Sequence, residues 1–156
     1  MFEEDKLVKC WTVIEQPHFV EFGKSNLEDS ILNFEHTDIQ SIDISKYQCI
    51  LLSAVLHYLD NYQDIIDLIC SSDIQTIILE RTPVCEKNII CIETVKEPIY
   101  NAAYAMHIFC EKQLKTLLAE KGYDLVDYWE SLVDSPIYVN DELVKFKSFI
   151  FEKVNY

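Results

Sequence analysis

Apolar residues occur in short unbroken runs along the chain, and the clearest run is Cys49–Ser53. It does not alternate with polar residues and is too short to cross a membrane, so it predicts a strand buried on both faces. A similar run at residues 76–79 follows a segment of helical spacing whose start Asp60 can cap. A strand, a helix and a strand in this order predict adjacent, parallel strands at the centre of a sheet.

Weaker patterns predict the remaining elements. Strands are expected at residues 10–15, 31–34, 88–95, 123–129 and 147–153. One helix is expected to begin near Pro17, and another to span residues 111–121 and end at Gly122. Alternating apolar strands and helices predict an α/β fold, with a mostly parallel sheet in three layers. The last two strands have no helix between them, so they should form an antiparallel pair at one edge.

Composition limits the classes of protein to which the chain can belong. Its 156 residues predict a single domain, and 49% hydrophobic and 12% aromatic residues predict a packed core. The formal net charge of −14 repels nucleic acids and anionic lipids, so neither is expected as a partner. No apolar stretch approaches the roughly 20 residues of a membrane-spanning helix, and the acidic start is unlike a signal peptide. We therefore expect a cytoplasmic protein.

The cysteine and histidine patterns favour neither disulfides nor a metal site. Cys49 and Cys91 lie within apolar runs, Cys70 closes a helix, and no two of the six cysteines have CxxC spacing. Buried free thiols in a reducing compartment are expected. The four histidines form no HxxxH or HxH pair, so no metal site is expected.

Three segments, in this order and spacing, resemble signature blocks of a bacterial family of S-adenosylmethionine-dependent methyltransferase-like proteins. They are Trp-Thr-Val-Ile-Glu-Gln-Pro-His-Phe-Val (residues 11–20), Leu-Leu-Ser-Ala-Val-Leu-His-Tyr-Leu (51–59) and Ile-Leu-Glu-Arg-Thr-Pro (78–83). Residues 98–104 and 118–123 are also similar, so the resemblance extends from residue 11 to about residue 129. It implies a Rossmann-like methyltransferase sheet and S-adenosylmethionine as the cofactor. The genes of such proteins tend to accompany surface-polysaccharide genes.

Against the methyltransferase pattern, the chain has no counterpart of the first strand and its glycine-rich turn. Only nine residues precede Cys10, and Gly23 and Gly122 lie elsewhere. Without that turn, backbone N–H groups do not approach the cofactor closely, because side chains bearing a Cβ block the approach. This chain alone is therefore expected to bind S-adenosylmethionine weakly or not at all.

The strands at residues 10–15 and 49–53 would then flank a gap at the centre of the sheet. Unpaired backbone groups there are costly, and three arrangements relieve the cost. The two edges close on each other, the residues before Cys10 fold into the gap, or another chain contributes a strand. Closure needs the fewest assumptions, and residues 2–9 are too acidic and too few to imitate a buried strand well. We expect self-association through exposed apolar surface, as a homo-oligomer or with a complementing chain.

The resemblance assigns a cofactor role to three residues, each with a structural alternative. Glu15 ends its strand where an acidic side chain holds the ribose hydroxyls; otherwise it is a solvated carboxylate at the start of a helix. Asp38 either accepts a hydrogen bond from the adenine amino group or forms an ordinary turn. Ser53 faces the cofactor through its hydroxyl or main chain, or it bonds to the local backbone.

Three further residues are candidates for the acceptor side. His57 and Tyr58 follow the strand Cys49–Ser53, and either takes a proton from a nucleophilic acceptor or packs on neighbouring strands. Arg81, the only arginine, holds a carboxylate or phosphate of the acceptor, or it forms a salt bridge to Glu80 or Glu86.

Three functions are consistent with the sequence. The first is a methyltransferase domain acting on a small metabolite or a surface-polysaccharide sugar. The second is a non-catalytic remnant or interaction module that kept the fold and lost the cofactor loop. The third is an unrelated α/β binding domain, against which the order of the blocks argues. His107 and Cys110 stand where the family pattern has tryptophan and serine, which leaves the identity of the acceptor open.

Overall fold

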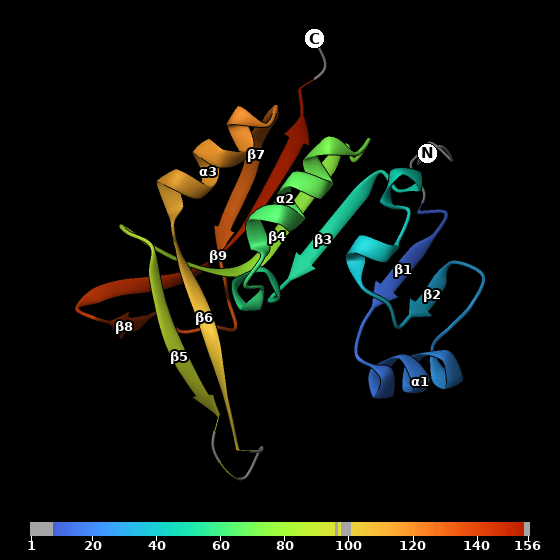
Figure 1. The fold of residues 1–156 in the computed structure, drawn as a ribbon, viewed down its shortest axis with the longest axis horizontal. Coiled ribbons are helices and arrows are strands. Elements are labelled where there is room, and N and C mark those ends of the chain that lie inside the picture. The colour runs from blue at the N-terminus through green and yellow to red at the C-terminus, as the bar shows by residue number, and fades with distance from the viewer. Residues whose placement is uncertain (1–7, 96, 98–100, 155–156) are drawn as a thin grey trace. The chain divides into compact units, whose positions relative to one another are not determined.

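The computed structural model describes residues 8–95, 97 and 101–154. The chain divides into two compact units, one ending at Asp43 and the other beginning at Ile44 (Figure 1). Residues 2–7, weighed above as a segment to fill the sheet, lie outside the described residues, as do residues 98–100 of one family block. The expectation of a single domain stays a prediction.

The N-terminal unit is a strand–helix–strand motif. Strands β1 (Trp11–Ile14) and β2 (Leu32–Glu35) pair in parallel, and helix α1 (Pro17–Asn26) connects them. Pro17 occupies the first turn, where its missing N–H costs nothing. Gly23 lets α1 pack tightly, because a Cβ there would lie 2.4 Å from the ring of Phe34. The short 3-10 helix η2 (Ile39–Ser41) follows β2.

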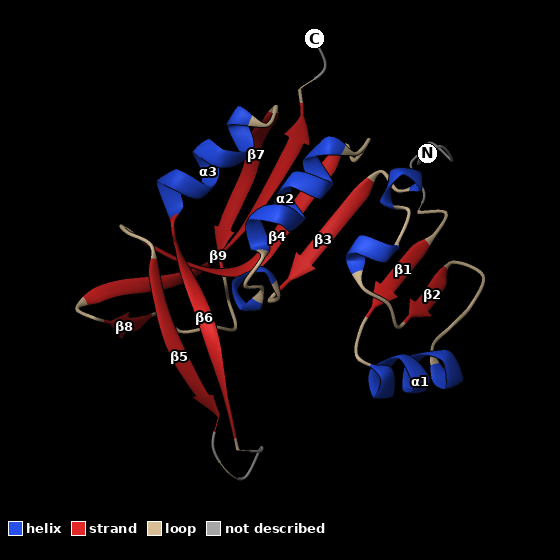
Figure 2. Ribbon diagram, viewed as in Figure 1, coloured by secondary structure: helices blue, strands red, loops and turns tan. Residues whose placement is uncertain are grey.

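The C-terminal unit is built around one mixed sheet of seven strands (Figure 2). Strands β3 (Cys49–Ser53) and β4 (Thr76–Cys85) pair in parallel, which confirms that these two apolar runs are neighbours. Strand β7 (Tyr123–Glu130) pairs antiparallel with β9 (Glu142–Lys153), and β9 also pairs antiparallel with β4. The predicted antiparallel pair is therefore confirmed, with β7 at one edge of the sheet.

Strand β4 changes partners along its length. A register shift lies between Leu79 and Thr82; before it β4 pairs with β3, and after it with β6 (Ala102–Cys110). Strand β6 forms a hairpin with β5 (Ile89–Val95), and β8 (Ile137–Val139) pairs with the start of β9. A second small core lies beneath this half of the sheet, formed by Ile89, Met106, Ile108 and Val144.

Helices α2 (Tyr62–Ser71) and α3 (Glu111–Glu120) lie in front of the strands of this sheet in Figure 1. Their apolar stripes are buried, with Ile65, Ile66 and Ile69 on α2 and Leu114 and Leu118 on α3. The chain leaves α3 through Gly122, at a φ of 84°, as expected of a left-handed stop. The predicted cap of α2 is wrong, because Asn61, not Asp60, immediately precedes the helix and gives it no side-chain hydrogen bond.

The expectation that Cys49–Ser53 is central and buried on both faces is wrong for the described residues. Within them, β3 pairs only with β4, and β1 pairs only with β2. Leu52 is the one buried residue of β3, whereas Leu51 on the opposite face is 37% exposed. Strands β1 and β3 belong to separate sheets, and the closure of one strand on the other stays a prediction. The apolar run shows that both faces of this strand could be buried, and the described elements cover only one of the two faces.

Replacing Tyr123 with phenylalanine should destabilise the C-terminal unit. The Tyr123 side chain is completely buried, and its hydroxyl donates a 2.7 Å hydrogen bond to the carbonyl of Ile74. Removing the hydroxyl leaves that carbonyl without this donor, so we expect a loss of about 1–3 kcal/mol of unfolding free energy in urea. Tyr138→Phe is the control, because Tyr138 is 76% exposed and should tolerate the same change. Equal effects of the two substitutions would contradict the prediction.

Candidate functional site

Strand β3 ends beside the middle of β4, at a pair of strained backbone positions. Strand β4 continues through Glu80 and Arg81 to Cys85 and is thus longer than the run at residues 76–79 predicts. Ser53 and Glu80 form the last register pair of the two strands, and the hydroxyl of Ser53 donates to the carboxylate of Glu80. Directly after this pair, Ala54 and Arg81 both adopt left-handed backbone conformations, with φ of 51° and 54°. Such conformations cost on the order of 1–3 kcal/mol for residues other than glycine, and they concentrate at functional sites.

Arg81 is held by a carboxylate on a neighbouring loop. Its Nε and one Nη donate to the two oxygens of Asp134 at 2.8 and 2.7 Å. Ser131 fixes Asp134, donating through its hydroxyl to the carboxylate and accepting from the backbone N–H of Asp134. Hydrogen bonding to Asp134 raises the pKa of Arg81, and the same bond lowers the pKa of Asp134. The predicted alternative of a salt bridge is therefore found, but its partner is Asp134, which sequence analysis did not consider.

His57 is a buried, neutral side chain. It lies in the 3-10 helix η4 (Leu56–Tyr58), is 3% exposed, and its ring centroid is 4.2 Å from that of Tyr58. Burial and then the nearby charge of Arg81 lower the pKa of His57 to about 4. Its Nδ1 has no hydrogen-bond partner within the described part of the chain. A base this weak and this deeply buried favours the packing role that the sequence left open beside proton transfer.

Tyr58 is the accessible member of this pair. It is 39% exposed, and its hydroxyl donates to the carboxylate of Glu93 on β5. The ring of Tyr104, on β6 directly opposite Glu93, meets the Tyr58 ring edge-on with centroids 6.0 Å apart. The half of the β5–β6 hairpin nearer its turn is thereby tied to η4. A tyrosine hydroxyl bonded to a carboxylate can pass on a proton, which suits the acceptor side of a transfer reaction.

The two predicted cofactor residues of the N-terminal unit are occupied by local backbone contacts. The carboxylate of Glu15 accepts a 2.9 Å hydrogen bond from the N–H of Gln16, where the chain enters α1. The carboxylate of Asp38 accepts from the N–H of Gln40 at 3.1 Å and caps η2. Both side chains remain exposed, so their assignment to ribose and adenine stays a prediction.

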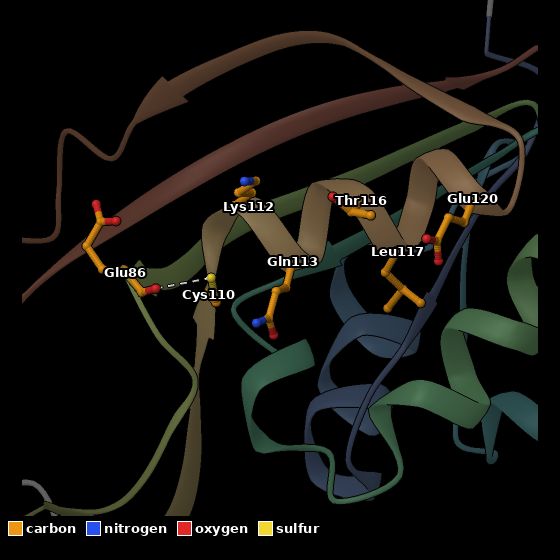
Figure 3. Close-up of a pocket in the computed structure, with 7 residues that line it drawn as sticks. All are labelled: Glu86, Cys110, Lys112, Gln113, Thr116, Leu117 and Glu120. Atoms are coloured by element: carbon orange, nitrogen blue, oxygen red, sulfur yellow. Dashed lines mark hydrogen bonds between the residues drawn. The ribbon is translucent and has the colours of Figure 1, made fainter.

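An open depression of about 470 Å³ lies along α3, away from this cluster (Figure 3). The thiol of Cys110 donates to the carbonyl of Glu86 at its edge, as Figure 3 shows. Its lining residues are Glu86, Cys110, Lys112, Gln113, Thr116, Leu117 and Glu120. None of the residues proposed from the sequence lines it. We therefore place the candidate site at the carboxyl end of β3 and the adjoining residues of β4, where strain and paired polar side chains coincide.

Sequence analysis missed Glu80, Glu93 and Asp134 as members of the site. Glu80 was considered only as a partner of Arg81, although it follows a predicted parallel strand, which was the available signal. Glu93 and Asp134 reach the site through the hairpin and the β7–β8 loop. Nothing in their local sequence marks them, because their positions depend on long-range pairing.

Some alternatives find no support in the described residues. Among residues 8–95, 97 and 101–154, no group of three or more His, Cys, Asp or Glu side chains is placed to hold a metal ion. All six cysteines are free thiols. No helix in the described part of the chain has the length and apolar character needed to cross a membrane.

No family model matches the chain, and no curated protein matches it. Solved structures do match. An S-adenosylmethionine-dependent methyltransferase of Methanosarcina mazei gives a TM-score of 0.62 at 11% identity, covering 93% of this chain and 82% of its own. A protein described as a pericyclic reaction enzyme gives 0.59 at 10% identity, covering 96% of this chain and 38% of its own.

A third match is the 1,6-didemethyltoxoflavin-N1-methyltransferase of Burkholderia thailandensis, solved with 1,6-didemethyltoxoflavin and S-adenosylhomocysteine. Its TM-score is 0.58 at 14% identity, with 92% of this chain covered, and the chain spans 61% of that enzyme's length. These matches confirm the predicted fold class. The chain has the Rossmann-like α/β fold of S-adenosylmethionine-dependent methyltransferases, with a parallel core and antiparallel strands toward the C-terminus.

The residues of this structure fit S-adenosylmethionine only in part. Polar side chains stand at the carboxyl ends of strands, where this fold binds ligands. Neither glycine provides a main-chain cradle: Gly23 packs on Phe34, and Gly122 ends a helix. These side chains offer hydrogen-bond partners to a ligand, whereas Gly23 and Gly122 offer no close backbone approach of the kind that anchors such a cofactor.

His57 should make the protein acid-sensitive in a defined pH window. Its pKa is about 4 in the folded protein and about 6.5 when unfolded, so between these values only the unfolded state binds the proton. Stability due to this group is present above pH 6.5 and is lost as the pH falls. We expect about 2 kcal/mol of that loss between pH 6.5 and 5, at roughly 1.4 kcal/mol per pH unit.

The measurement is the urea-unfolding free energy of wild type and His57→Gln across pH 4.5–8. The variant carries no imidazole, so its curve should be flatter below pH 6.5 and parallel to wild type above it. Curves that stay parallel over the whole range would show that His57 takes up its proton equally well in both states.

Proposed function

We propose that this chain is a methyltransferase-like protein that uses S-adenosylmethionine and acts on a small metabolite or a surface-polysaccharide sugar. The observation that best supports the proposal is the pair of left-handed backbone conformations at Ala54 and Arg81. They lie beside Ser53, at the carboxyl end of β3, and beside its register partner Glu80, in a fold that methyltransferases share. The free thiols are in keeping with a reducing compartment such as the cytoplasm.

On the cofactor side, Glu15 would hold the ribose hydroxyls, Asp38 the adenine amino group, and Ser53 a polar atom near the methyl donor. Bound S-adenosylmethionine supplies both the methyl group and its leaving group, so the protein has only to orient the acceptor and take up one proton. Carboxylates suit the first two roles because they accept hydrogen bonds from hydroxyl and amino groups with charge assistance.

On the acceptor side, His57 and Tyr58 are the proposed proton acceptors, and the contacts favour Tyr58. Tyr58 is 39% exposed and its hydroxyl already donates to Glu93, so this carboxylate can take the hydroxyl proton when the oxygen accepts one from the methyl acceptor. Arg81 would orient the acceptor rather than neutralise it, because both oxygens of Asp134 already occupy its guanidinium.

The alternative is a non-catalytic remnant or interaction module. One observation favours it: neither glycine forms a cofactor cradle. Separately, one protein of the same fold is described as a pericyclic reaction enzyme. The fold therefore serves more than methyl transfer. Binding of S-adenosylhomocysteine separates the two proposals, since a remnant that lost the cofactor loop has no reason to retain it.

We expect S-adenosylhomocysteine to bind this chain with a dissociation constant above the micromolar range. Glu15→Ala should reduce the binding free energy by about a further 1–3 kcal/mol, because the ribose hydroxyls would lose their charged acceptor. Calorimetry at high protein concentration measures both values. Glu35→Ala is the matched control, since Glu35 also ends a strand of the N-terminal unit and is exposed. Equal affinities for Glu15→Ala and wild type would remove Glu15 from the site.

We also expect the chain to self-associate, or to bind a complementing chain. Within the described residues, β1 and β3 each have a single partner strand, and the hairpin exposes Ile90 and Ile92 at 68% and 66%. Open strand edges and apolar surface both favour association. Light scattering on the purified chain should therefore give a mass above 18.3 kDa. A monodisperse monomer that binds S-adenosylhomocysteine at micromolar concentration would contradict this expectation and the expected weak binding together.

A further inference from the structure

The side chains at the candidate site carry an excess of negative charge. Glu80 and Glu93 are carboxylates with hydroxyl partners, Ser53 and Tyr58, which leave their charge in place. The charge of Arg81 is matched by Asp134, to which it donates two hydrogen bonds. The cluster formed by these two pairs and the salt bridge therefore presents net negative charge to an acceptor. An anionic group placed here would meet three carboxylates against the single guanidinium of Arg81.

Two aromatic rings border the same cluster. Tyr58 and Tyr104 are in edge contact with centroids 6.0 Å apart, and they remain 39% and 40% exposed. Glu93 lies directly opposite Tyr104 in the hairpin and accepts from the Tyr58 hydroxyl. Exposed tyrosine rings beside a carboxylate form the arrangement that binds ammonium groups, through the negative ring faces and the ionic contact together.

An unpartnered buried nitrogen lies beside these rings. His57 is 3% exposed, its ring contacts that of Tyr58 at a tilt, and its Nδ1 has no hydrogen-bond partner among the described residues. An unsatisfied buried polar atom is unfavourable and calls for an explanation. The neutral imidazole that carries its proton on Nε2 has an acceptor at Nδ1, and an ammonium group is purely a donor.

We propose that the acceptor carries a primary amine, which this site binds as an ammonium group between Tyr58, Tyr104 and Glu93. That the bound amine compound is also the methyl acceptor rests on the proposed function; its binding does not. The two glutamates, the two tyrosine rings and Nδ1 of His57 all accept hydrogen bonds or attract a cation. A phosphate or carboxylate, the ligand predicted for Arg81 from sequence, is disfavoured because Asp134 already occupies the guanidinium.

Three sugars of nearly the same shape test the charge preference: D-glucosamine is cationic, D-glucose is neutral and D-glucuronate is anionic. Each is titrated into the full chain while the tyrosine ring resonances are followed by NMR. Glucosamine should shift the signals of Tyr58 and Tyr104, bind at least tenfold more tightly than glucose, and leave glucuronate without measurable binding. Glucuronate binding as tightly as glucosamine would overturn the proposal, as would glucosamine binding that leaves both tyrosines unperturbed.

Glu93→Gln tests the ionic contact without removing the hydrogen-bond acceptor of Tyr58. It should weaken glucosamine at least tenfold and leave the weak binding of glucose unchanged. Glu120→Gln on the exposed face of α3 is the control, and it should leave both affinities as in wild type. An unchanged glucosamine affinity in Glu93→Gln would overturn the proposal. Thermal unfolding of both variants checks that the fold is retained.

Tyr104 separates ring contact from hydroxyl contact. Tyr104→Phe keeps the ring and should retain glucosamine affinity within about twofold, whereas Tyr104→Leu removes the ring and should lose about threefold or more. Equal losses in the two variants would exclude the ring as the binding surface.

Binding of S-adenosylhomocysteine, measured on the same proteins, keeps this proposal distinct from the proposed function. Selective glucosamine binding without S-adenosylhomocysteine binding supports an amine site and counts against methyl transfer. S-adenosylhomocysteine binding without amine selectivity supports the proposed function and overturns the amine site.

Discussion

The interruption of β4 at Glu80 and Arg81 is the constraint on which the C-terminal unit depends. A strand that continued in regular register past Leu79 would keep β3 as its neighbour and leave no place for β6. The left-handed conformation of Arg81 redirects the backbone, so that β4 pairs first with β3 and then with β6 while β9 follows it on the other side. The same residue that costs conformational energy thus marks the point at which β4 exchanges β3 for β6 as its neighbour.

The interruption also explains where the polar side chains lie. Beyond their last register pair, β3 and β4 separate, and their side chains no longer pack against each other. Ser53 and Glu80 bond across the opening, and Arg81 turns to Asp134 on the β7–β8 loop. The Arg81–Asp134 pair is partly exposed, so it adds little to the stability of the fold. Its effect is on position: it fixes the β7–β8 loop relative to β4 and directs the positive charge of Arg81 away from the acceptor side. The backbone conformation at Arg81 thus determines where the charged side chains of the site lie.

The sequence predicted those parts of the fold that depend on neighbouring residues. Periodicity located β3, β4, α2 and α3, and Gly122 located the end of α3 correctly. Strand β6 was missed, because Ala-Ala-Tyr-Ala is not a strand-forming sequence by itself and becomes one by pairing with β5. The start of β9 was missed for the same reason. Burial of β3 on both faces was wrong, because an apolar pattern records what a strand can bury and not which elements are present to cover it.

The candidate site was predictable only on the strand side. Ser53, His57 and Arg81 follow apolar runs, and the rule that ligands bind at the carboxyl ends of parallel strands was enough to select them. Asp134 lies 53 positions from Arg81, and Glu93 lies 35 positions from Tyr58. Their proximity is produced by strand pairing and loop conformation, for which a single sequence holds no local signal. Arg81 illustrates the result: its ion pair was foreseen as an alternative, but with the wrong partners.

The pairing of β4 with β9 has a consequence for synthesis on the ribosome. Strand β4 is translated near the middle of the chain, whereas its antiparallel neighbour is the last described strand to be translated. Until β9 arrives, Ile77 and Leu79 lack their neighbours Phe151 and Phe149, and one edge of β4 is open. Such a nascent chain exposes an apolar strand edge while its last part is made, which is the kind of segment that chaperones bind. The wide sequence separation that builds the central sheet therefore makes the newborn chain dependent on protection from aggregation.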